Sequence, residues 1–346
     1  MPRIVVNTRV LTAPTTGVQR YTRALLERWN GHIDQLGPGI ALGGFAGHAW
    51  EQLVLPGRLK GRLLFSPSNT GPLSARRQVL TVHDMSMFDC PETFSAQFGA
   101  WYQFLLPRLI LRVRLVITHT EFTKGRILAH IPVDPGKVAV IPSGVDSQFC
   151  PEAASQTEIA KASLKLPSSK YILAVGSVEP RKNLLRLLDA WARMQGRLPN
   201  DLWLLVVGGR GSRRVFGGVQ LDTLPTRVLF LGYVAEEWLP GLYAGALATA
   251  YLSVYEGFGL PLLESMACGT PVLAGNRSSL PEVVGDAGLS VDPFNVDEIA
   301  QGLHRMVKDS ALRAELQQRG LNRARRYSWD ETAKLTWQAL DASAAS

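Results

Sequence analysis

The sequence contains little cysteine, no long apolar run and no signal peptide. Its three cysteines, Cys90, Cys150 and Cys268, are odd in number and widely spaced. This argues against a disulfide framework or a zinc site and favours a reducing compartment, so we expect a cytoplasmic location. Pro240 and several small residues interrupt the longest uncharged run, residues 239–255, so no membrane helix is predicted. The N-terminal residues lack the apolar core and cleavage site of a signal peptide.

Several common ligand motifs are also absent. The first predicted strand is not followed by Gly-x-Gly-x-x-Gly, which weakens a dehydrogenase reading, and the absence of Gly-x-x-x-x-Gly-Lys-Ser/Thr excludes a P-loop. There is no Asp-x-Asp pair to hold a divalent cation against a diphosphate, and no cluster of histidines and cysteines. We therefore expect neither a metal nor a resident cofactor.

The net charge of +8 is distributed unevenly along the 346 residues. Residues 1–166 hold 18 Lys and Arg against 11 Asp and Glu, whereas residues 167–346 hold 19 against 18. A basic first half predicts an anionic partner, which can be a nucleic acid, a phosphorylated substrate or a lipid surface. Its aromatic and basic segment, residues 97–117, fits either a peripheral membrane helix or a buried helix with exposed arginines, and Pro107 is expected to interrupt the helical pattern.

Apolar runs and amphipathic segments alternate through both halves of the chain. This alternation predicts an α/β protein with two doubly wound parallel sheets and ligands at the carboxyl ends of the strands. Strands are predicted at residues 3–7, 61–66, 78–83, 115–120, 138–142, 171–176, 202–207, 228–231, 247–252 and 271–274. Helices are predicted at residues 18–29, 183–194, 236–246 and 260–268, followed by a long helical close. A polar, helix-poor linker over residues 147–169 gives domains at 1–165 and 166–328, with residues 329–346 packing back on the first.

The most informative segment runs from Glu256 to Glu264. Between these two carboxylates lie a glycine-rich turn and an apolar run that predicts a helix from Leu260. The glycines allow backbone N–H groups to approach a ligand, and the start of a helix favours phosphate. Glu256 can accept hydrogen bonds from sugar hydroxyls and Glu264 from a ribose diol, which predicts a sugar-nucleotide site. The alternative is a solvated helix face with a charge at its N-terminus.

Three further groups of residues follow predicted strands. Arg181 and Lys182 can neutralise a diphosphate without a metal, or they can cap a helix in solvent. His83 ends an apolar strand, where it can contact a sugar hydroxyl, act as an acid or base, or have only a structural role. Gly17 lies in a turn before a helix, where backbone N–H groups can bind phosphate, although the single glycine taken by itself favours a plain turn.

With these residues assembled, the chain resembles the retaining glycosyltransferases of family 4 over nearly its whole length. Its segments are similar to the N-terminal loop, the His motif, the Ser-Glu-Phe-Ser-Lys run, the Asn-Gly-Val-Asp segment, the nucleobase segment and the paired-Glu motif of that family. The matching residues are 17–21, 83–84 with 90–92, 120–124, 142–146, 230–234, 256–264, 279–283 and 328–329. One departure is Ser177, where many members have arginine, and Arg181 is expected to compensate.

The resemblance implies a GT-B fold, in which two Rossmann-like domains face each other across a cleft. It also implies that Arg181 and Lys182 bind the donor diphosphate, that Glu256 holds the donor sugar and that His83 lies beside that sugar. The implied donor-binding positions are Gly17, Tyr233, Val234, Gly257, Phe258, Gly259, Leu260 and Glu264.

The resemblance further implies metal-independent transfer with retention, by front-face attack. A hexose, with mannose from GDP-mannose favoured, would be moved to a glycan or lipid-linked acceptor of a cell-surface polysaccharide. Rhamnose, fucose and glucose donors fit the same motifs, as do a sugar-nucleotide epimerase and a donor-binding protein without activity. We expect no nucleic acid partner. We do expect peripheral contact with the inner face of an anionic membrane.

Overall fold

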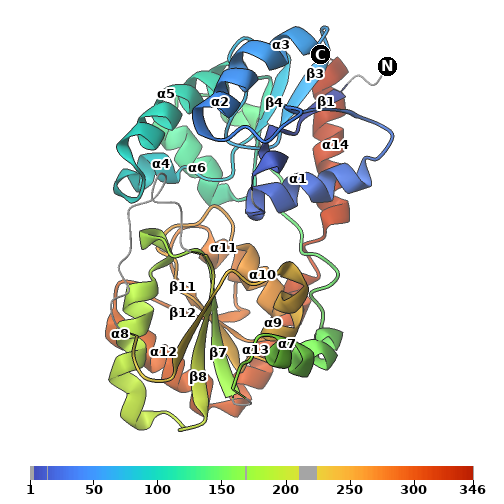
Figure 1. Cartoon of the computed structure of the whole chain (residues 1–346). Coiled ribbons are helices and arrows are strands. Elements are labelled where there is room, and N and C mark those ends of the chain that lie inside the picture. Colours follow the sequence, from blue (N-terminus) through green and yellow to red (C-terminus); the bar gives the residue numbers. More distant parts are fainter. Residues whose placement is uncertain (1–3, 14, 168–169, 210–223, 346) are drawn as a thin grey trace. The chain divides into compact units, whose positions relative to one another are not determined.

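The computed structural model describes residues 4–13, 15–167, 170–209 and 224–345 (Figure 1). The chain divides into two compact units. The first unit comprises residues 1–89, 96–144 and 327–346, and the second comprises residues 90–95 and 145–326. Residues 145–165 thus belong to the second unit, whereas the sequence analysis assigned them to the first domain. The C-terminal segment belongs to the first unit.

The first unit is built on a six-stranded parallel sheet with the order β2-β1-β3-β4-β5-β6. All residues of β1, β3 and β4 are buried, because helices cover both faces of the sheet. The strands are β1 Ile4–Asn7, β2 Asp34–Leu36, β3 Leu63–Ser66, β4 Gln78–Thr81, β5 Leu115–Thr118 and β6 Val138–Val140.

The helices of the first unit include a final one from the end of the chain. They are α1 Gly17–Arg28, α2 Gly44–Ala49, α3 Leu55–Arg58, α4 Ser86–Asp89, α5 Ala96–Arg112, α6 Glu121–His130 and α14 Trp329–Ala345, with a π-helical segment, η2 Trp50–Val54, and short 3-10 turns η1 Arg9–Thr12 and η4 Pro135–Lys137. α14 lies beside α1 (Figure 1). The Trp29 indole N–H donates to the carbonyl of Ala333 at 3.2 Å. At the start of α14, a Cβ on Gly144 would lie 2.2 Å from the Trp329 backbone nitrogen, so the close approach of these two backbones requires glycine at position 144.

Helix α5 continues through Pro107, contrary to the expected interruption. A proline costs about 3 kcal/mol in the interior of an isolated helix because it removes a hydrogen bond and crowds the preceding turn. Here Leu105, Leu106, Leu109 and Ile110 are buried on both sides of it. Each buried leucine or isoleucine contributes about 2 kcal/mol, so burial outweighs the cost of the proline.

The second unit contains a six-stranded parallel sheet with the order β12-β11-β10-β7-β8-β9. Its strands are β7 Lys170–Val175, β8 Leu202–Val207, β9 Val228–Gly232, β10 Ala248–Tyr251, β11 Val272–Gly275 and β12 Gly288–Val291. The sequence analysis missed β2 and β12. Both are edge strands, which are exposed on one side, so their short polar or small-residue sequences lack the continuous apolar run of a central strand.

Helices cover both faces of this second sheet. Its helices and turns are η3 Pro91–Thr93, η5 Pro151–Gln156, α7 Thr157–Ser163, η6 Pro180–Lys182, α8 Leu184–Met194, η7 Gln195–Arg197, η8 Glu236–Trp238, α9 Leu239–Ala244, α10 Leu260–Ala267, α11 Leu280–Val284, α12 Val296–Lys308 and α13 Ser310–Ala324. α8 and α12 pack together over the face that carries Ile172 (Figure 1). The next residue back, Tyr171, points to the opposite face, where its hydroxyl donates to the Leu242 carbonyl in α9.

The expected linker contains a helix. α7 packs against α9, the Thr157 hydroxyl donates to the Gly241 carbonyl at 3.0 Å, and Ala160 is fully buried. Polar residues alternate with the few apolar ones in this segment, so its sequence pattern did not predict the helix. Among the residues that the structure describes, no helix has the length and apolar character needed to cross a membrane.

Candidate active site

Charged side chains gather at the carboxyl ends of β7 and β10 in the second unit. The two strands are paired and parallel, so their ends lie at the same edge of the sheet. β7 leads through Gly176 into η6, which carries Arg181 and Lys182, and Glu256 follows β10 in the next loop. The backbone N–H of Val254 donates to the Arg181 carbonyl at 2.8 Å and joins the two loops.

Four ions form the charged cluster: Glu179, Arg181, Lys182 and Glu256. Lys182 Nζ lies 2.5 Å from Glu256 Oε1, and an Arg181 Nη1 donates to Glu256 Oε2 at 3.2 Å. Arg181 Nε also donates to Glu179 Oε2 at 2.9 Å. The four side chains are between 5% and 15% exposed. Two cations and two carboxylates give the cluster no net charge before a ligand binds.

The Glu256 carboxyl is strongly acidic. Burial alone would raise its pKa, but the charges of Lys182 and Arg181 and the hydrogen bond from Lys182 lower that pKa to about 2. Glu256 is therefore an ionised acceptor at neutral pH. It cannot donate a proton, but it can accept hydrogen bonds from hydroxyl groups.

The loop after Glu256 presents the N-terminus of α10. Gly259 precedes this helix with a φ of 113°, and a Cβ there would lie 3.0 Å from a Leu280 methyl, so both backbone and space favour glycine. The Ser279 hydroxyl lies 2.9 Å from the Glu256 carbonyl and 3.0 Å from that of Phe258. These contacts fix the turn, which includes Gly257, against the first turn of α10 at Leu260.

Glu264 lies inside α10 and is only 3% exposed. Its Oε2 accepts a hydrogen bond of 2.8 Å from the Tyr243 hydroxyl in α9. The second carboxylate of the motif is therefore held by a buried partner. Its expected role at a ribose stays a prediction.

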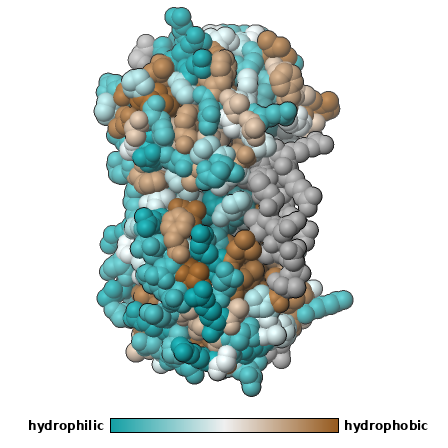
Figure 2. All heavy atoms as spheres, turned by 90° about the vertical axis from the view of Figure 1, so that its left-hand side faces the viewer, coloured by the Kyte–Doolittle hydropathy of each residue, from teal (hydrophilic) through white to brown (hydrophobic). Residues whose placement is uncertain are grey.

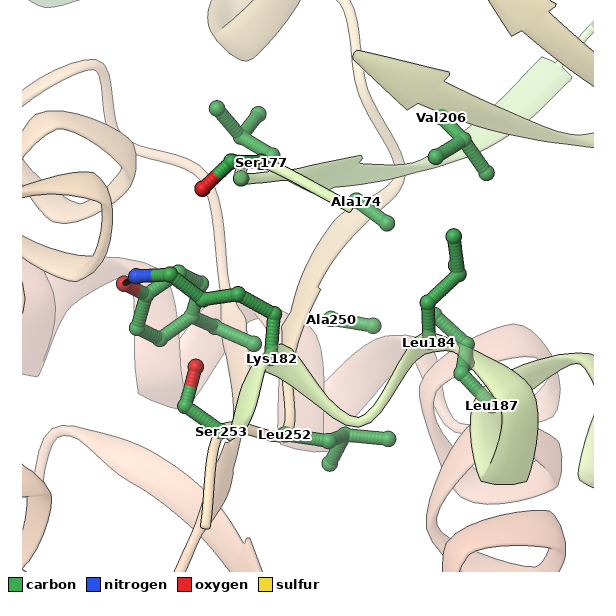
Figure 3. Close-up of a pocket in the computed structure, with 12 residues that line it drawn as sticks. Ala174, Ser177, Lys182, Leu184, Leu187, Val206, Ala250, Leu252 and Ser253 are labelled. Carbon is green, nitrogen blue, oxygen red and sulfur yellow. Dashed lines mark hydrogen bonds between the residues drawn. The ribbon is translucent and has the colours of Figure 1, made fainter. Parts of the chain in front are cut away.

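A small pocket, partly open to solvent, lies between the ends of β7 and β10. Figure 3 shows Ser177, Lys182 and Ser253 with their polar ends on one side of it, and Leu184, Leu187 and Val206 on the other. The polar side is suited to phosphate or hydroxyl groups, whereas the apolar side continues into the core of the unit.

In the first unit, His83 meets a second histidine that sequence analysis did not single out. β4 and β5 are paired, and His83 and His119 follow their ends. His83 Nδ1 lies 3.0 Å from His119 Nε2, and His83 Nε2 lies 2.9 Å from the Pro67 carbonyl. Burial lowers the pKa of both, that of His119 to about 3, so both are neutral. Both ring nitrogens of His83 are therefore already in contact with the protein. To bind a sugar hydroxyl, His83 must release either His119 or the Pro67 carbonyl.

The remaining predicted positions lie at loops in both units. In the first unit, Gly17 is the exposed first residue of α1, where Thr16 and Gln19 form a capping box. In the second unit, Tyr233 and Val234 follow β9 and are 70% and 5% exposed. A nucleobase can meet this loop through the backbone and the exposed Tyr233 ring, which stays a prediction.

Sequence analysis also missed residues that hold the site together. Asn183 adopts a left-handed conformation with φ 61°, and its side-chain N–H groups donate to the carbonyls of Leu252 at 3.1 Å and Pro293 at 2.6 Å. It thereby ties the charged cluster to β10 and to the loop after β12. Asparagine is tolerated in this conformation, and its place directly after Arg181 and Lys182 was the available signal.

In the described parts of the chain, no three His, Cys, Asp or Glu side chains are grouped as metal ligands. Metal independence stays a prediction.

The sequence matches two family descriptions, in consecutive parts of the chain. Residues 61–149 match "Glycosyltransferase Family 4" and residues 155–323 match "Glycosyl transferases group 1". Among curated proteins, the O-antigen chain mannosyltransferase B of Escherichia coli is 33% identical over 282 residues, which are 81% of this chain and 74% of that protein.

Solved structures show the same fold. Sucrose-phosphate synthase from Thermosynechococcus elongatus superposes with a TM-score of 0.76 at 20% identity, covering 99% of each chain. Anabaena HepE, in complex with UDP-glucose, has a TM-score of 0.75 at 17% identity and covers 98% of this chain and 99% of its own. The expected fold class is confirmed, and the chain belongs to glycosyltransferase family 4, as a sugar-transferring enzyme with the GT-B fold.

Proposed function

We propose that this protein transfers mannose from GDP-mannose, with retention and without a metal, to a glycan or lipid-linked acceptor of a cell-surface polysaccharide. The observation that carries the proposal is the joint contact of Lys182 and Arg181 with the Glu256 carboxylate, at the carboxyl ends of paired strands. The similarity to an O-antigen chain mannosyltransferase supports the choice of sugar.

Donor binding would exchange partners within the charged cluster. Since each cation begins beside a carboxylate, the diphosphate must draw Lys182 and Arg181 away from Glu256. The freed Glu256 oxygens then accept hydrogen bonds from the hydroxyls of the donor sugar. The N-terminus of α10 adds backbone N–H groups that favour a negative phosphate.

The transfer step then proceeds on one face of the sugar. The bond from the anomeric carbon to the diphosphate oxygen breaks, and a bond to the acceptor oxygen forms on the same face. The acceptor hydroxyl proton passes to the departing phosphate oxygen. Lys182 and Arg181 stabilise the negative charge that develops on that oxygen. Electrostatic stabilisation of this kind is usually the largest single contribution to catalysis.

A panel of sugar nucleotides tests the donor. Thermal unfolding is measured with GDP-mannose, GDP-fucose, UDP-glucose and dTDP-rhamnose, for the wild type and for Glu264→Ala, because a ligand of the folded state raises its stability. We expect the wild type alone to be stabilised, and most by GDP-mannose. Stabilisation by another sugar nucleotide would reassign the donor, and no stabilisation at millimolar ligand would overturn the proposal.

Product analysis tests the reaction. After incubation with GDP-mannose and a lipid-linked glycan, NMR of the new linkage should show the anomeric configuration of the donor, and activity should survive EDTA. Inversion would contradict the front-face route, and loss of activity that added Mg²⁺ restores would contradict metal independence.

We also propose peripheral contact of the first unit with an anionic membrane. Phe104 and Leu111 on α5 are 46% and 49% exposed, and the Arg108 guanidinium lies 3.9 Å from the centre of the Phe104 ring. Phe45 and Leu53, at α2 and η2, are 83% and 79% exposed. Figure 2 shows small groups of hydrophobic residues among hydrophilic ones, a mixture suited to an interface.

Vesicle sedimentation tests this contact. Binding to vesicles with anionic lipid should fall about tenfold in Phe45→Ser/Leu53→Ser and in Arg108→Gln/Arg112→Gln, because apolar burial and charge both contribute. Arg114→Gln is the matched control, since its guanidinium is half-buried and donates to the Ser343 carbonyl of α14. Equal sedimentation of all variants would contradict membrane contact.

A further inference from the structure

Both carboxylates of the Glu256–Glu264 segment accept a hydrogen bond from a buried tyrosine. Tyr251, the last residue of β10, is 3% exposed and donates its hydroxyl proton to Glu256 Oε1 at 2.8 Å. Tyr243 in α9 is fully buried and donates to Glu264 Oε2 at 2.8 Å. A buried hydroxyl bound to a carboxylate restricts that carboxylate to one orientation.

The Tyr251 hydroxyl also meets a cation. Lys182 Nζ donates to the Tyr251 oxygen at 3.0 Å, and it also lies 2.5 Å from Glu256 Oε1. A phenol has one proton, and because burial and the nearby charge of Glu256 raise the pKa of Tyr251 well above its usual value, it keeps that proton. The chain of hydrogen bonds therefore has one direction, from Lys182 through Tyr251 to Glu256.

This arrangement divides the Lys182 ammonium between two partners. Without the Tyr251 hydroxyl, Lys182 would pair with Glu256 alone, and Glu256 Oε1 would lose one of its two donors. Glu256 Oε1 would then lose both of these donors whenever Lys182 turns toward a phosphate. With the hydroxyl present, Glu256 keeps a fixed donor and stays aimed while the lysine moves.

A further buried hydroxyl, that of Ser253, lines the pocket beside these groups. Ser253 is 1% exposed, and its hydroxyl lies close enough to Glu256 and Tyr251 to lower the pKa of both. Ser253, Tyr251 and Lys182 all line the pocket, and Figure 3 shows the Ser253 oxygen on its polar side. Ser253 therefore belongs to the same polar group as Tyr251 and Glu256, at the edge of the pocket.

We propose that Tyr251 and Tyr243 are positioning residues, one for each carboxylate of the motif. Tyr251 orients Glu256 and Lys182 toward the sugar end of the donor, and Tyr243 orients Glu264 toward its nucleoside end. The inference rests on the proposed function, since both ends belong to one sugar nucleotide.

Three tyrosine-to-phenylalanine variants test the inference. Tyr251→Phe and Tyr243→Phe each remove one hydroxyl that binds a carboxylate. Tyr171→Phe is the matched control, because this tyrosine is 2% exposed and its hydroxyl donates to a backbone carbonyl, that of Leu242, at 2.8 Å. Titration calorimetry measures the affinity of each variant for GDP and for GDP-mannose, and thermal unfolding confirms that each is folded.

The two positioning residues should differ in which ligand they affect. Tyr251→Phe should weaken GDP-mannose about tenfold more than GDP and lower kcat, because only GDP-mannose carries the sugar that Glu256 meets. Tyr243→Phe should weaken both ligands by the same factor, about tenfold, and leave kcat unchanged. Tyr171→Phe should bind both as the wild type does.

The possible failures are distinguishable. If the wild type binds both ligands and Tyr251→Phe weakens them equally, or not at all, the role of Tyr251 is overturned. If Tyr243→Phe binds GDP as the control does, the role of Tyr243 is overturned. If the folded wild type binds no sugar nucleotide of the panel, the proposed function fails, and this inference fails with it.

Discussion

The two units place polar groups at equivalent edges of parallel sheets but give them opposite electrostatic character. In the second unit, Glu256 is buried as an ion between Lys182 and Arg181. In the first, His83 and His119 are buried as neutral rings that meet each other and backbone carbonyls. The fold fixes where such side chains gather, and the residues after each strand decide whether the site is charged.

This difference follows from the cost of burial. Removing a carboxylate from water costs several kcal/mol, and only well-placed opposite charges offset that cost. Two cations do so for Glu256, which keeps its charge. For the histidine pair, burial is the largest influence and lowers the pKa of both rings, so they stay neutral.

The largest expected effect comes from breaking the charge balance in the second unit. Lys182→Met leaves the charged cluster with one cation and two carboxylates. We expect the free energy of unfolding, measured with urea, to fall by about 3 kcal/mol, because a buried carboxylate loses its closest cation. Transfer activity should fall at least about a hundredfold, since a cation at the diphosphate is lost.

A double variant separates these two losses. Lys182→Met/Glu256→Gln removes one charge of each sign, so it should regain most of the stability but none of the activity. His119→Asn in the first unit should cost only about 1 kcal/mol, because no charge becomes unbalanced. Equal destabilisation by Lys182→Met and by the double variant would contradict the charge-balance argument.

A smaller effect, on pH dependence, distinguishes the two sites. The pKa of His119 falls on folding from 6.5 to about 3, so its stabilisation is complete above pH 6.5 and is lost as the pH falls toward 3. The pKa of Glu256 falls from 4.5 to about 2, so its stabilisation is complete above pH 4.5 and is lost as the pH falls toward 2. The two windows overlap only below pH 4.5.

Urea unfolding at about pH 7.0 and about pH 5.5 tests whether the two pH ranges are separate. Both values lie above about pH 4.5, where the contribution of Glu256 no longer changes with pH. Between them His119→Asn should show a shallower slope of stability against pH than the wild type, by up to about 1.4 kcal/mol per unit. Glu256→Gln should keep the wild-type slope in this range. A slope unchanged in His119→Asn would mean that His119 is not buried as a neutral ring.

A further comparison concerns an asparagine in each unit, Asn183 in the second and Asn69 in the first, that ties the site to its neighbours. Asn183→Ala in the second unit should cost about 2–3 kcal/mol, because it loses two hydrogen bonds to buried carbonyls and a tolerated left-handed conformation. Asn69→Ala in the first unit should cost about 1 kcal/mol, mainly the 2.7 Å bond from the His83 backbone N–H.

Asn183→Gly separates the two contributions at this position. Glycine adopts the left-handed conformation freely but cannot form the side-chain bonds. Chemical denaturation of this variant should therefore show an intermediate loss. Wild-type stability of Asn183→Gly would mean that the bonds to Leu252 and Pro293 contribute nothing.

The sequence predicted the central strands and the charged residues of the second unit well. Continuous apolar runs predict buried parallel strands, and polar residues at their ends predict a site, as Lys182 and Glu256 show. The edge strands β2 and β12 lack that run and were missed, whereas the edge strands β6 and β9 were predicted. Burial around Pro107, which depends on the whole unit, overrode the local preference to end the helix.

The partners of the predicted residues were not predictable. Tyr251 and His119 each follow apolar strand residues and look like part of the core in sequence. Their hydrogen-bond partners are distant in sequence and meet them only through strand pairing, as Lys182 meets Tyr251 and His83 meets His119. A pattern of spacing along one chain contains no information about such cross-strand contacts.

The position of α14 has a consequence for synthesis on the ribosome. The first unit is completed only by α14, whose Asp330 and Ala333 contact Arg28 and Trp29 and which is made after the second unit. The second unit is contained within residues 90–326 and can fold while α14 is still being made. The first unit therefore stays incomplete until the whole second unit has been made, and the face of α1 that packs on α14 stays uncovered in the meantime.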